Sequence, residues 1–234
     1  MALVKYGGGI IQMSGSIAGN TFARNRSGNY VRARTKPVNP NTDRQQTVRA
    51  NMGTVAHRWT NVLTQLQREG WNEYAAEVEV TNRLGETIKL SGFNHYCRSN
   101  SAILLAGFAL VDTAPGIFTL PDTDPTITCI YDDAAQDIEI AFDDTMDWLD
   151  EDNAGLLVYQ GKPQSAGIAF FDGPWRFVDS VDGDSGTAPT TPSTEPSEFV
   201  ITAGQLAYTQ FRILRADGRL SEFFRAPAVA VITV

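Results

Sequence analysis

Hydrophobic residues follow two different spacings along the chain. Between residues 42 and 106 they recur every three or four positions, which is the period of an amphipathic helix. From residue 126 onward, short runs of β-branched and aromatic residues alternate with Gly, Pro, Asp and Ser, which is typical of a β-sandwich. We therefore predict an α+β protein with a helical module over 41–111, a linker over 112–125 and an all-β sandwich over 126–234.

The helical part carries its own start and stop signals. Capping boxes of the form Thr-x-x-Gln begin at Thr42 and at Thr64, and a helix N-terminus is stabilised when both side chains satisfy backbone N–H groups. Ser91 can cap a third helix that Gly107 ends. A short hairpin over 80–90 is expected before it, and the apolar side of the first helix comprises Val48, Met52, Val55, Trp59, Val62 and Leu66.

The first 40 residues have a different pattern, that of a glycine-rich arm followed by a basic β-hairpin. Two alternating runs flank Ser27-Gly28-Asn29, and glycine supplies the positive φ that a tight turn needs. Since alternate residues of a strand share a face, each strand presents a basic face. The residues concerned are Arg24 and Arg26 on the first strand and Tyr30, Arg32 and Arg34 on the second.

Charge divides the chain into two unlike halves. Its 42% hydrophobic and 20% charged residues indicate a folded chain, and its net charge is −8. Residues 1–111 hold 13 Lys and Arg against 6 Asp and Glu, whereas residues 112–234 hold 6 against 21. The N-terminal half at +7 is attracted to acidic surfaces, and the other at −15 repels them. The predicted partner-binding residues are Arg24, Arg26, Tyr30, Arg32, Arg34, Arg44 and Arg49.

An acidic protein surface is the favoured partner, ahead of nucleic acid. The helices over 42–78 could be read as a helix-turn-helix, with the second helix in a DNA groove. That helix carries Glu69, Glu73 and Glu77, whose carboxylates repel phosphate.

Catalytic and metal-binding patterns are weak. The two histidines, His57 and His95, lie on predicted helices, and the sequence holds no Gly-x-Ser-x-Gly elbow, P-loop or His-Glu-x-x-His. The acidic stretches 143–152 and 182–184 could hold calcium, but neither completes a calcium-loop pattern. We therefore expect no enzyme, no cofactor and no metal.

The sequence also carries signals on membrane association, on the state of the cysteines and on one polar loop. No apolar run approaches the length that spans a bilayer, and the N-terminus lacks the order of a signal peptide, so no membrane is expected. Cys97 and Cys129 are expected to be free thiols. The stretch over 182–198, rich in Gly, Ser, Thr and Pro, is predicted to be an exposed loop.

A longer motif resembles structural proteins of tailed phages and prophages. It runs from Arg24 to Thr42 as RNRSGNYVRARTKPVNPNT and continues with Gln45-Gln46 and Arg49. In such proteins a Trp, a Leu-Thr segment with Gln-Arg-x-x-Trp-Asn and a Gly-Phe-Asn segment follow. Here these are Trp59, residues 63–72, with one extra residue, and residues 92–94. The resemblance covers about residues 15–107 and implies a virion component.

The C-terminal part looks like an immunoglobulin or fibronectin type III module of the kind displayed on virions. Together these resemblances predict a capsid decoration or cement protein, assembled into the virion in the host cytoplasm. The basic half would dock on the major capsid protein or another virion protein, and the chain is expected to form a homo-oligomer. A tail, head-completion or adaptor component is an alternative. A carbohydrate-binding adhesion module, using exposed Trp148 and Trp175, is another.

Overall fold

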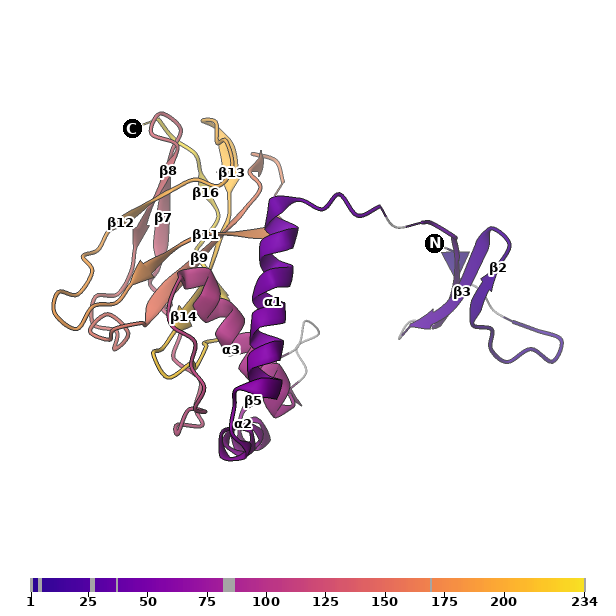
Figure 1. The fold of residues 1–234 in the computed structure, drawn as a ribbon. Coiled ribbons are helices and arrows are strands. Elements are labelled where there is room, and N and C mark those ends of the chain that lie inside the picture. The colour runs from indigo at the N-terminus through magenta and orange to yellow at the C-terminus, as the bar shows by residue number, and fades with distance from the viewer. Residues whose placement is uncertain are drawn as a thin grey trace. The chain divides into compact units, whose positions relative to one another are not determined.

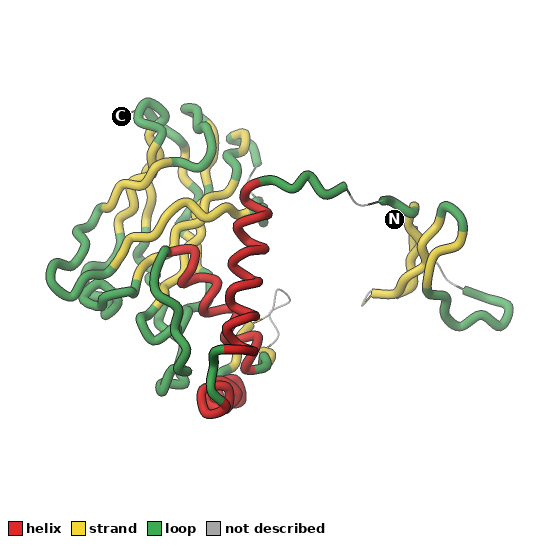
Figure 2. Tube along the Cα trace, in the orientation of Figure 1, coloured by secondary structure: helices red, strands yellow, loops and turns green. Residues whose placement is uncertain are grey.

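A computed structural model describes residues 2–3, 6–25, 28–36, 38–81, 87–168 and 170–233 of the chain. Within these residues three α-helices accompany several antiparallel sheets, which confirms the predicted α+β class (Figures 1 and 2). The chain divides into two units, residues 1–46 and residues 47–234.

The first unit is a small antiparallel sheet with the strand order β1-β4-β3-β2. The strands are β1 (Ala2–Leu3), β2 (Gly15–Ile17), β3 (Asn20–Asn25) and β4 (Gly28–Ala33). Strands β3 and β4 form the predicted basic hairpin. The glycine-rich arm supplies the two outer strands, because it pairs with the hairpin on both sides.

The turn of this hairpin differs from the prediction. Asn25 pairs with Gly28, so Gly28 and Asn29 belong to β4 and do not form the turn. The connecting residues, 26 and 27, lie outside the described residues. The hydrogen-bonded ladder therefore extends further than the sequence indicated, since glycine can also occupy an edge position of a strand.

The helices begin and end close to the predicted positions. They are α1 (Asp43–Asn61), α2 (Gln65–Glu77) and α3 (Gly92–Ala106), with a short hairpin of β5 (Glu79–Thr81) and β6 (Thr87–Lys89) between the last two. The Thr64 capping box is complete, because its backbone N–H donates to Gln67 Oε1 at 2.8 Å. Ser91 caps α3, and Gly107 ends it at φ 80°.

One aromatic cluster holds these helices together. Trp71, Tyr74 and Tyr96 are buried, and Trp71 contacts both tyrosines edge to face at centroid distances of 5.8 and 5.5 Å. Val48 and Met52, in the first half of α1, stay exposed. Val62 and Leu66 lie past the end of α1 and are exposed as well, so only Val55 and Trp59 of the predicted stripe are covered.

The remaining residues form sheets that enclose a second core. The strands are β7 (Thr128–Asp132), β8 (Asp137–Ala141), β9 (Gly155–Gly161), β10 (Gln164–Ser165), β11 (Trp175–Asp182), β12 (Ser193–Pro196), β13 (Gln205–Ala207), β14 (Thr209–Leu214), β15 (Phe224–Arg225) and β16 (Val229–Ala230). The sheets have the orders β12-β8-β7, β11-β9-β14-β15 and β10-β13-β16. Ile138 and Ile140 of β8 share one core with Leu156 of β9 and Phe211 of β14.

Part of the predicted 182–198 loop is a strand. Residues 193–196 form β12, which pairs with β8 at the edge of its sheet. Pro196 is tolerated there because an edge strand can lack one ladder hydrogen bond. The polar composition of this stretch reflects its edge position, which is why it resembled a loop.

The structure groups the helices and the sheets of residues 128–230 in one unit, although the sequence suggested a boundary at 112–125. Ala102 and Ile103 of α3 pack with Leu157 of β9 and Leu214 of β14, so α3 lies against the outer face of that sheet (Figure 1). Burying both apolar surfaces against each other makes the two parts a single folding unit.

Candidate functional site

The predicted docking residues lie on the small basic sheet and on α1. In the hairpin Arg24 pairs with Asn29 and Arg32 pairs with Thr21. Directly paired residues share a face and adjacent positions do not, so Arg24 and Arg32 project from opposite faces of the sheet. The sheet is therefore basic on both sides.

The other described residues of the predicted set lie on β4, directly after it and on α1. Tyr30 lies on the face of Arg32, and Arg34 follows β4, where its backbone N–H donates to Gly19 O at 2.8 Å. Arg26 lies outside the described residues. Arg44 and Arg49 are exposed on α1. The structure thus brings Tyr30 and Arg32 together and places Arg24 apart from them.

This sheet has no core of its own within the residues that the structure describes. None of the side chains of residues 6–24, 29–36 and 38–46 is buried. Ile11 and Val38 are 91% and 88% exposed. A few short strands without a covered apolar face are marginally stable in water. The unit therefore has the properties of a segment that a partner stabilises.

The segment predicted to be a linker, residues 112–125, is fastened along its length. Arg58 Nε and Nη2 donate to the two carboxylate oxygens of Asp112 at 2.6 and 2.7 Å, and Trp71 Nε1 donates to the Asp112 carbonyl at 2.9 Å. Arg219 donates to Thr119 O at 3.3 Å. At its end, buried Asp124 accepts from the backbone N–H groups of Thr126 and Asp143. The segment is a structural strap.

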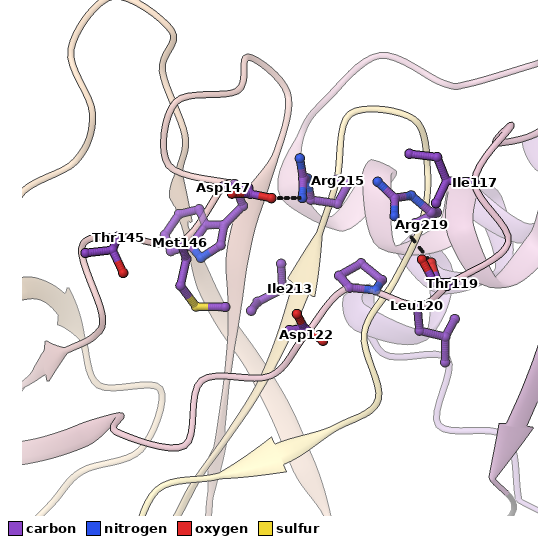
Figure 3. Close-up of a pocket in the computed structure, with 12 residues that line it drawn as sticks. Ile117, Thr119, Leu120, Asp122, Thr145, Met146, Asp147, Ile213, Arg215 and Arg219 are labelled. Carbon is purple, nitrogen blue, oxygen red and sulfur yellow. Dashed lines mark hydrogen bonds and ion pairs between the residues drawn. The ribbon is translucent and has the colours of Figure 1, made fainter.

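A pocket of about 690 Å³ lies beneath this strap (Figure 3). It is lined by the strap itself, by residues 145–148 and by side chains of β14 and the loop after it. Arg215 is paired with Glu151 and with Asp147 at 3.6 Å, and Arg219 is paired with Asp217 at 2.7 Å. Carboxylates already neutralise both arginines. The two side chains therefore link parts of the fold and are not free to bind an anionic ligand.

The two histidines and the buried cysteine Cys129 lie on three different elements, α1, α3 and β7. His95 is buried against the edge of Tyr74, and burial together with nearby Arg98 lowers its pKa to about 4, which leaves it neutral at pH 7. Burial raises the pKa of Cys129 to about 12, so its thiol stays protonated. His57 is exposed on α1, on a different element from both.

The carboxylates of the two acidic stretches accept hydrogen bonds from nearby residues and form local turns. Asp143 Oδ1 accepts from the Thr145 hydroxyl and backbone N–H, which lowers the pKa of Asp143. Asp184 Oδ1 accepts from Gly186 N at 2.7 Å. Over the described part of the chain, no group of three or more His, Cys, Asp or Glu side chains is placed to hold a metal ion.

A pocket that the sequence did not indicate lies on the outer face of the β11-β9-β14-β15 sheet, where Tyr159, Trp175 and Phe223 meet Gln210 and Arg225. Alternation could not reveal it, because β9 and β14 are largely buried on both faces, so neither strand shows the one exposed face that alternation would indicate. Of the two tryptophans predicted to be exposed, Trp148 is fully buried in the core, whereas Trp175 is half-buried in this pocket. Trp148 is therefore not a binding surface.

None of the helices in the described residues has the length and apolarity of a membrane span. No protein-family model, curated protein or solved structure matches this chain.

Proposed function

We propose that this chain is a structural protein of a phage particle, placed on the capsid, where it decorates or cements the coat lattice. The observation that carries the proposal is the basic N-terminal sheet, in which none of the described side chains is buried, in contrast to the second unit with its several cores. A sheet of this kind gains its stability when a partner covers it. The resemblance to phage structural proteins, over about residues 15–107, covers both strands of its hairpin, which supports a virion partner.

The partner that fits is an acidic protein surface. Residues 1–42 contain no Asp or Glu, so the sheet presents a single sign of charge. Arginine binds carboxylates through paired hydrogen bonds, which suits docking on a neighbouring subunit. The acidic second unit would then project away from other acidic surfaces.

The sandwich would be the displayed module, and we propose that it is of the fibronectin type III kind. The order of its main strands supports this proposal. The first, second and fifth (β7, β8, β12) share one sheet, and the third, fourth, sixth and seventh (β9, β11, β14, β15) share the other. An immunoglobulin constant domain instead keeps the fourth strand with the first sheet.

The test is co-sedimentation of the purified chain with coat-protein shells encoded in the same genome and assembled without it. The full chain should bind at low salt and release at high salt, whereas residues 47–234 should not bind. Arg24→Glu and Arg32→Glu should each weaken binding by about tenfold, because each reverses a charge. Lys162→Glu, at an exposed position of the sandwich, is the matched control.

Three results would contradict the proposal. Binding by residues 47–234 alone would move the docking surface to the second unit. Binding to tails or connectors in place of shells would favour the tail, head-completion or adaptor role, and the copy number per particle would then separate these roles. Equal binding of the full chain and both charge-reversed variants would exclude arginine-led docking.

A further inference from the structure

The outer face of the β11-β9-β14-β15 sheet is covered at one end only. Leu157 of β9 and Leu214 of β14 lie under α3. Tyr159, which packs against this cluster, and Gln210 lie on the same face and line a pocket of about 550 Å³. The same sheet face therefore changes from a helix-packing surface to a pocket within a few residues.

Three residues that line the pocket, Tyr159, Gln210 and Arg225, belong to a row of side chains in register across four strands. Phe177 of β11 pairs with Tyr159 of β9, Tyr159 pairs with Gln210 of β14, and Gln210 pairs with Arg225 of β15. Directly paired residues share a face, so all four side chains of the row project from the same side of the sheet. The row is aromatic on β11 and β9 and polar on β14 and β15. This gives the pocket an apolar side and a hydrogen-bonding side.

The aromatic walls are held in place by arginines. Phe223 meets Tyr159 edge to face at 5.6 Å, and the Arg212 guanidinium lies 4.5 Å from the centre of the Phe223 ring. Arg225 lies 4.9 Å from the centre of the Trp175 ring. Since cations already occupy these ring faces, a cationic ligand would meet repulsion in place of a cation–π contact.

The polar side contains an acceptor that the protein does not satisfy. Gln210 is 8% exposed, and its Oε1 atom is buried without a hydrogen-bond partner in the described structure. Arg225, next to it, donates to Phe171 O and to Asp172 Oδ1, both at 3.1 Å. A buried acceptor without a donor destabilises a protein, and such groups in native structures are usually met by water or a ligand.

We propose that this pocket binds a neutral saccharide. The pyranose ring offers an apolar C–H face for Tyr159 and Phe223 and hydroxyl groups that can both donate to Gln210 Oε1 and accept from neighbouring donors. A proline-rich segment would also fit aromatic walls, but prolines have no N–H to donate. Residues 112–234 carry a net charge of −15, which disfavours an anionic ligand. The site is independent of the basic sheet and of the docking role proposed for it.

The experiment is to apply the full chain to an array of neutral and anionic bacterial and plant oligosaccharides, and then to titrate each bound neutral glycan while following tryptophan fluorescence. Two variants test the site. Phe223→Ala removes a ring that is 48% exposed, and Gln210→Met removes the unpaired acceptor while keeping the size of the side chain. Phe118→Ala, at a ring 42% exposed on the strap, is the matched control.

Binding of at least one neutral glycan is expected, with a loss of about tenfold or more in each pocket variant and no change in Phe118→Ala. Gln210→Met should keep or raise the thermal midpoint, because it removes an unsatisfied group, so lost binding would not reflect unfolding. The proposal is overturned if no neutral glycan binds, if only anionic glycans bind, or if both pocket variants bind as the unaltered chain does. The last result would leave ordered water as the partner of Gln210.

Discussion

The two units of this chain differ in how much apolar surface they bury. Residues 47–234 bury aromatic and aliphatic side chains in an aromatic helix cluster, a sandwich core and the contact of α3 with the sheet. Residues 1–46 form a sheet in which no described side chain is buried and no carboxylate precedes Asp43. The contrast teaches that hydrogen-bonded strands alone do not make an independent fold, and it underlies our proposal that another surface completes the first unit.

The largest effect should come from the sandwich core. Phe211 is fully buried and contacts Phe224 at a centroid distance of 5.8 Å. Phe211→Ala should lower the free energy of unfolding by about 3–5 kcal/mol, because it removes apolar contacts and leaves a cavity. Chemical denaturation followed by tryptophan fluorescence measures this change. A loss below about 1 kcal/mol would mean that this core does not carry the stability of the second unit.

A smaller effect should appear when the pH falls. The pKa of His95 is lowered to about 4 in the folded chain, against about 6.5 when unfolded. The unfolded chain therefore binds the extra proton between these values, and the stability present at pH 7 is lost as the pH falls. At pH 5 the loss should be about 2 kcal/mol.

His95→Gln should remove most of this dependence between pH 5 and 7. His57→Gln, at the exposed histidine, is the control and should leave it unchanged. Denaturant midpoints at the two pH values provide the measurement. An identical pH dependence in His95→Gln would show that His95 does not titrate as a buried, neutral group.

The strap should contribute less to the free energy of unfolding than the Phe211 core or the neutral state of His95. Asp112→Ala removes the paired hydrogen bonds from Arg58 but keeps the backbone carbonyl that accepts from Trp71. Since the Arg58 side chain is about a third exposed, solvent screens the pair, and the expected loss is about 1 kcal/mol. Asp122→Ala, an exposed residue of the same strap, should change the unfolding midpoint by less than half as much. Similar losses in both variants would mean that the Arg58–Asp112 pair adds no stability beyond that of an exposed carboxylate on the strap.

The sequence allowed some of these features to be predicted and concealed others for physical reasons. Caps depend on local hydrogen bonds, so Thr64, Ser91 and Gly107 were correctly placed as helix ends. The strap looked like a linker because its ties, such as Arg58 to Asp112, join residues far apart in the sequence. The pocket at Gln210 depends on the register of four strands, which local patterns do not encode.

The smallest effect on the free energy of unfolding is expected from a substitution in the first unit. This substitution also tests the contrast between the two units most directly. Phe22 of β3 is half-buried and lies opposite Val31, without a core beneath it. Phe22→Ala should change the free energy of unfolding of the free chain by less than about 0.5 kcal/mol, since little apolar contact is lost. If the first unit is completed by a partner, the same substitution should weaken co-sedimentation with coat-protein shells several-fold. A loss of 2 kcal/mol or more in the free chain would instead show that the sheet has a core of its own, and the comparison between the two units would fail.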